Sequence, residues 1–129
     1  MAGPSIVTRI VQTRERSDCA IASMAMLSGR TYEDVLREVV VADPKDKGRK
    51  GLSDHQVRRV MRALGVPVTH RSRVDYDEDY GLLRLHDHMA LLRNGLIVED
   101  HTLWDVDDWR RQRGYRLDMT VCGIFVAVE

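Results

Sequence analysis

The chain has few aromatic residues, no excess of either charge and no long apolar segment. Aromatic side chains make up 5% of its 129 residues, which argues against binding of nucleic acid by base stacking. The 20 basic and 20 acidic residues balance, so the protein as a whole does not attract nucleic acid or an anionic membrane. No apolar run approaches the ~20 residues that span a bilayer. We therefore expect partners other than nucleic acid and membranes.

The start of the chain and its two cysteines indicate a cytoplasmic protein. Residues 1–5 lack the basic and apolar regions of a signal peptide. In such a chain two cysteines are more often two thiols than a disulfide. Cys122 lies in the β-prone segment 120–128, and we expect it in the core of a C-terminal strand. The length suits a single domain over residues 1–129.

Capping residues predict three helices in the first half of the chain. Ser17 is a suitable N-cap for a helix that runs to about Ser28. Thr31 opens a second helix with an apolar stripe. Ser53 and Gln56 form a capping box that starts a third helix. The links between these helices are short, so we expect the helices to pack together.

The periodicity changes from helical to alternating in the second half. The pattern there predicts the entry of a strand at 66–69, two strands at 88–92 and 96–99, a short helix at 106–113 and a final strand at 120–128. Helices first and strands later indicate an α+β fold, with N-terminal helices packed on an antiparallel β-sheet.

Cys19 is the candidate nucleophile, because it falls in the first turn of the first expected helix. Free backbone N–H groups and the positive end of the helix dipole stabilise an anion there, and the ionised thiol is the reactive form. The alternative is a small buried residue without chemistry, as most free cysteines are. A cysteine nucleophile also needs a base, and the base usually needs an orienting group.

His88 is the candidate base, and the hairpin that follows it offers an orienting carboxylate. If residues 93–95 form a three-residue loop, Leu92 pairs with Leu96. Asp100 then lies opposite His88 on the same face, with Cβ atoms ~5 Å apart. We expect this register because it produces a Cys–His–Asp arrangement.

A two-residue turn at Asn94-Gly95 would give a different partner. His101 would then lie across from the histidine, with Glu99 on the same side. A slip of one residue exchanges the two faces of a strand, so Asp100 would point away. Asp105 and Asp107 are lesser candidates for the orienting role.

The same region also resembles a cluster of metal ligands. His86 and His88 share a face if the segment is a strand, and Asp100 and His101 follow on the next strand. A third strong ligand at a fixed spacing is missing, so we expect no metal and no other cofactor.

Several segments together resemble a known enzyme family. They are the stretch from Gln12 to the helix start at 18–22, the second helix at 32–35, and strand 88–92 leading to Asp100. In these features the chain resembles the papain-like cysteine peptidases. The similar branch contains the double-glycine leader (bacteriocin-processing) peptidases and their small relatives.

The resemblance implies a papain-like fold and a catalytic triad. Cys19 would attack a carbonyl carbon, and His88 would take the thiol proton and pass it to the leaving amine. Asp100 would orient the imidazole, and Gln12 would donate a side-chain N–H to the oxyanion. The implied function is hydrolysis of a peptide, isopeptide or amide bond in a peptide or protein substrate. The alternative is a papain-like scaffold that binds proteins without catalysis.

Overall fold

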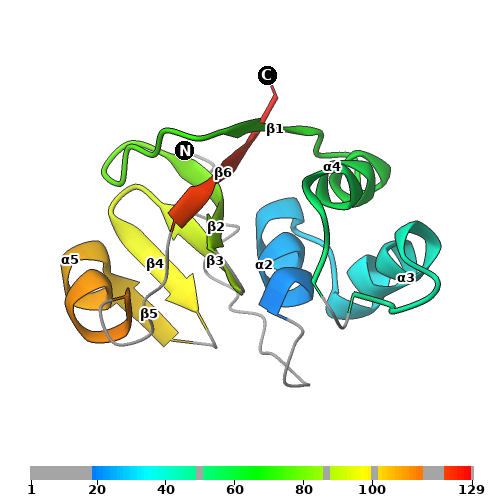
Figure 1. Ribbon diagram of the computed structural model, residues 1–129, viewed down its shortest axis with the longest axis horizontal. Coiled ribbons are helices and arrows are strands. Elements are labelled where there is room, and N and C mark those ends of the chain that lie inside the picture. Colours follow the sequence, from blue (N-terminus) through cyan, green and yellow to red (C-terminus); the bar gives the residue numbers. More distant parts are fainter. Residues whose placement is uncertain (1–18, 49–50, 86–87, 100–101, 115–120, 129) are drawn as a thin grey trace.

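The structure is a computed structural model that describes residues 19–48, 51–85, 88–99, 102–114 and 121–128. In chain order the elements are α2 (Cys19–Ser28), α3 (Tyr32–Ala42), α4 (Asp54–Ala63), β1 (Val68–Arg71), β2 (Tyr80–Leu85), β3 (His88–Arg93), β4 (Leu96–Glu99), β5 (Thr102–Asp105), α5 (Val106–Trp109), the π-helical turn η1 (Arg110–Gly114) and β6 (Val121–Ala127). In Figure 1, α3 and α4 lie at one side of the molecule, α2 lies beside the sheet, and α5 lies next to β4 and β5. None of the helices described is long and apolar enough to cross a membrane.

The described strands form one sheet in the order β1-β6-β2-β3-β4-β5, and every neighbouring pair is antiparallel. The expected α+β class, with helices before an antiparallel sheet, is therefore confirmed. Strands β2 and β5 go beyond the expected elements. β2 is buried on both faces and so lacks a polar alternation, whereas β5 is a short edge strand with exposed side chains on both faces.

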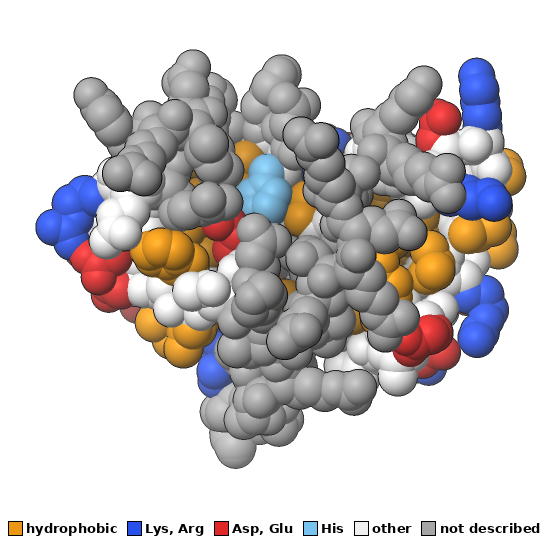
Figure 2. Space-filling view, turned by 90° about the horizontal axis from the view of Figure 1, so that it is seen from below, with side chains coloured by type: hydrophobic (Ala, Val, Ile, Leu, Met, Phe, Trp, Pro, Cys, Tyr) orange, Lys and Arg blue, Asp and Glu red, His pale blue; other side chains and the backbone are white. Residues whose placement is uncertain are grey.

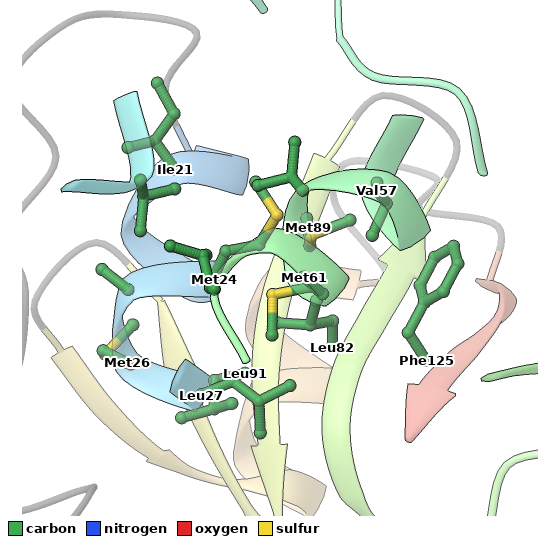
Figure 3. Packing of buried hydrophobic residues seen from close by; sticks show 14 of the residues in the cluster. Ile21, Met24, Met26, Leu27, Val57, Met61, Leu82, Met89, Leu91 and Phe125 are labelled. Atoms are coloured by element: carbon green, nitrogen blue, oxygen red, sulfur yellow. The ribbon is translucent and has the colours of Figure 1, made fainter. Parts of the chain in front are cut away.

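Each face of the sheet is covered by its own hydrophobic cluster. Neighbouring residues such as Leu82 and Leu83, or Ala90 and Leu91, belong to different clusters, because successive side chains of a strand point to opposite faces. The first cluster joins the sheet to α2, α3 and α4 and is rich in methionine (Figure 3). The second cluster lies on the other face, where Trp109 of α5 is its largest buried side chain.

The starts of the second and third predicted helices are confirmed by their caps. Thr31 Oγ1 accepts a hydrogen bond from the Asp34 backbone N–H at 3.1 Å. Ser53 and Gln56 form the expected capping box, with distances of 3.1 and 2.9 Å. Each of these bonds satisfies an N–H group that has no partner within the helix.

The register expected for the β3–β4 hairpin is wrong. Arg93 pairs with Leu96, so the loop has two residues instead of three. Asn94 and Gly95 have φ angles of 44° and 88°. A turn with positive φ at both central residues matches the right-handed twist of the flanking strands, and Asn-Gly is the pair that adopts it most readily.

The core position expected for Cys122 is also wrong. This cysteine lies in β6 as predicted, but its side chain is exposed. The pairing of β6 with β2 shifts there, because Arg84 pairs with Gly123 whereas Leu85 pairs with Val121. Cys122 is thus the extra residue of a bulge, and a bulge redirects the side chains around it.

Candidate active site

Cys19 is the first residue of α2, and its side chain is half-buried against the first cluster. One turn further on, Ser23 donates a hydrogen bond from Oγ to the Met89 carbonyl oxygen at 3.3 Å. Met89 follows His88 in β3. This bond therefore holds the start of the helix against the start of the strand, where the cysteine and the histidine lie.

His88 and Glu99 form a buried pair at the end of the sheet. The ring donates from Nε2 to Oε2 of Glu99 at 2.8 Å, and the two side chains are 16% and 2% exposed. His88 is the first residue of β3 and Glu99 is the last residue of β4. The two-residue turn at Asn94-Gly95 places His88 and Glu99 on the same face of the sheet. In this register Glu99 therefore supplies the carboxylate that contacts the ring.

Trp109 contacts the same carboxylate from the second cluster. Its indole Nε1 donates to Oε2 of Glu99 at 3.1 Å, and the residue is 1% exposed. The residue pattern of 106–113 predicts the helix but not this contact. The one indication of this contact is chemical, because a buried tryptophan usually needs an acceptor for its N–H.

The histidine holds its proton through the neutral range. Burial alone would lower the pKa of His88, but hydrogen-bonding interactions with the Cys19 and Glu99 side chains, together with their charges, outweigh it. The net effect raises the pKa of His88 from 6.5 to about 10. Because Nε2 faces Glu99, Nδ1 is the ring nitrogen available to the thiol.

The other candidate residues fall into two groups. Gln12, Asp100 and His101 lie outside the described residues. Asp105 is described, and its carboxylate caps α5 by accepting bonds from the backbone N–H groups of Asp107 and Asp108. It therefore has a local role away from His88. Among the residues that the structure describes, no group of three or more His, Cys, Asp or Glu side chains is gathered as for a metal ion.

One face of the molecule combines a histidine with hydrophobic and charged side chains. Figure 2, a view from below Figure 1, shows a histidine side chain with hydrophobic side chains on both sides of it. An acidic side chain lies beside the histidine in this view, and most of the Lys and Arg side chains visible among the described residues lie towards its outer edges. Among the described residues, the titratable groups that act on the His88 ring are its neighbours Cys19 and Glu99.

Comparisons of the chain with models of protein families, with curated proteins and with solved structures found no match. What the site can do chemically follows from its own residues. A thiol beside an imidazole, which in turn contacts a buried carboxylate, is an arrangement suited to nucleophilic attack with proton transfer.

Proposed function

We propose that this chain is a cysteine hydrolase of papain-like fold, which cleaves a peptide, isopeptide or amide bond in a peptide or protein substrate. The observation that carries the proposal is the placement of Cys19 at a helix start next to His88, whose ring is held by Glu99. Glu99 has the orienting role that the sequence assigned to Asp100.

The reaction follows from the order of these groups. The Cys19 sulfur attacks the carbonyl carbon and forms a C–S bond, and the proton on His88 passes to the leaving amine as the C–N bond breaks. Water then attacks the thioester, His88 accepts a proton from it, and the carboxylic acid leaves as the C–S bond breaks. The ionised sulfur and the protonated His88 are thereby restored, and no electron acceptor is needed.

Two features support stabilisation of the charges that form. The backbone N–H groups of the first turn of α2 have no acceptor within the helix, and the N–H of Cys19 is the proposed first donor to the oxyanion. Gln12 stays the proposed second donor, as the family resemblance implies. The protonated His88 places a positive charge beside the sulfur.

The test is the rate of Cys19 alkylation by iodoacetamide across the acidic and neutral pH range. Mass spectrometry of tryptic peptides separates the two cysteines, because Cys19 lies in 17–30 and Cys122 in 117–129. A thiol with a pKa of ~8.5 is only ~0.3% ionised at about pH 6, so an ionised Cys19 should react faster than glutathione by about two orders of magnitude.

Three variants make the test specific. His88→Ala should reduce the rate to that of an ordinary thiol, whereas His55→Ala, an exposed histidine on α4, should leave it unchanged. Cys19→Ala should abolish hydrolysis of internally quenched peptides. If Cys19 reacts like glutathione and His88→Ala has no effect, the hydrolase proposal is overturned and the non-catalytic binding protein replaces it.

A further inference from the structure

We propose that Trp109 is a positioning residue of this site, which acts on Cys19 through Glu99 and His88. The inference rests on the proposed function, because it concerns how the base of that reaction is held. The indole N–H and the imidazole N–H both point at one oxygen, Oε2 of Glu99, at 3.1 and 2.8 Å. The carboxylate is therefore the link between the tryptophan and the histidine.

A glutamate in this position needs a second donor. Its side chain has one more rotatable bond than an aspartate, so a single hydrogen bond to His88 leaves more ways for the carboxylate to turn. The indole donor selects the arrangement in which Oε2 faces the ring. Burial strengthens this selection, because Glu99 is 3% exposed and water does not compete freely for its oxygens.

Trp109 itself is held by packing on the face of the sheet opposite α2. It is 1% exposed and belongs to the second cluster, which includes Leu92 and Ile97 of the strands that carry the histidine and the glutamate. A large ring enclosed in this way has few alternative orientations, so the direction of its N–H is fixed. The second cluster thus determines where the base of the site lies.

Trp104 offers a matched control. It lies in β5 and also packs against the second cluster, but it is half-buried. Within the described part of the chain its indole makes no hydrogen bond. Replacement of either tryptophan by phenylalanine keeps an aromatic ring. Only Trp109→Phe also removes a hydrogen-bond donor to Glu99.

The first experiment measures the pH profile of Cys19 alkylation by iodoacetamide in both variants. Trp109→Phe should slow the reaction at about pH 6 by about tenfold or more, the factor that corresponds to the loss of a hydrogen bond to a charged group. Trp104→Phe should match the unsubstituted protein. A change of fold stability alone would not shift the profile of the folded protein towards that of an ordinary thiol.

The second experiment needs no catalysis and no change at Trp109. The two indole N–H groups give two NMR signals in isotopically labelled protein, and Trp104→Phe assigns them. His88→Gln should shift the Trp109 signal, because both groups share Oε2, and should leave the Trp104 signal in place. This measurement tests the positioning role of Trp109 even if Trp109→Phe does not fold.

The outcomes separate the two proposals. If Cys19 of the unsubstituted protein reacts like glutathione, the hydrolase proposal fails. If it reacts fast but equally fast in Trp109→Phe, or if His88→Gln leaves the Trp109 signal unmoved, the positioning role of Trp109 is refuted and the hydrolase proposal stands.

Discussion

Glu99→Gln perturbs the charge of the site with the least change of shape. The amide oxygen of glutamine can still accept hydrogen bonds from His88 and Trp109, so packing is preserved. What is lost is the negative charge that stabilises the imidazolium. We expect the variant to be less stable than the parent at about pH 6, where His88 is charged.

The size of the effect follows from the pKa of His88. A rise from 6.5 to about 10 corresponds to about 5 kcal/mol at 1.36 kcal/mol per pH unit, and Cys19 and Glu99 share it. The loss of a hydrogen bond to a charged group costs about 1.5–3 kcal/mol, which lies within that total. We therefore expect Glu99→Gln to lower the free energy of unfolding by about 2 kcal/mol at about pH 6.

The pH dependence has a definite sign. A group whose pKa is raised on folding binds its proton more tightly in the folded state, so its contribution is complete below the unfolded pKa of 6.5. That contribution is lost as the pH rises through the folded pKa of about 10. The difference in stability between the parent and Glu99→Gln should therefore be largest at about pH 6 and should close by about pH 10.

Urea unfolding at a series of pH values measures this difference. The Cys19→Ala background removes the thiol, so that only the Glu99 part of the interaction with His88 is followed. Glu78→Gln is the control, because Glu78 is an exposed carboxylate in the loop before β2. A difference for Glu99→Gln that equals the control at about pH 6, or that does not change up to about pH 10, would refute the ion-pair argument.

Two further predictions concern the scaffold. Ser53→Ala removes the side-chain half of the α4 capping box and should cost about 1 kcal/mol of unfolding free energy, measured by urea unfolding; no loss would contradict the role of the cap. Gly81→Ala adds a methyl group that overlaps the Phe125 carbonyl oxygen where β2 meets β6. Because a backbone atom cannot move aside as a side chain can, we expect the free energy of unfolding to fall by about 2 kcal/mol or more. An unchanged melting temperature would contradict this and show that β2 and β6 can shift enough to accommodate the methyl group.

The helical half of the fold is readable from local signals. Thr31 and Ser53 mark the starts of α3 and α4 because a side-chain oxygen at a helix start satisfies backbone N–H groups a few residues away. Gly29 marks the end of α2 with a φ of 72°, a conformation that glycine adopts without strain. These interactions span four residues or fewer, so the residue pattern contains all the information they need.

The hairpin shows where a functional argument misleads. Asn94-Gly95 favours the two-residue turn on backbone grounds, and the structure has that turn. The expectation of a three-residue loop rests only on the placement of Asp100 opposite His88. The backbone preference of Asn-Gly determines the turn, whereas the expected triad adds no interaction that could change it. Glu99 therefore lies beside the ring.

The remaining parts of the site depend on contacts between distant elements. Cys19 comes from the helix layer on one face of the sheet, and Trp109 comes from the cluster on the other face. They meet through His88 and Glu99 only because β3 begins at the same end of the sheet where β4 ends. No periodicity in the sequence encodes which strand lies beside which. The expected strands do not include β2, which lies between β3 and β6 in the sheet, so the surroundings of the site follow from sheet topology rather than from local pattern.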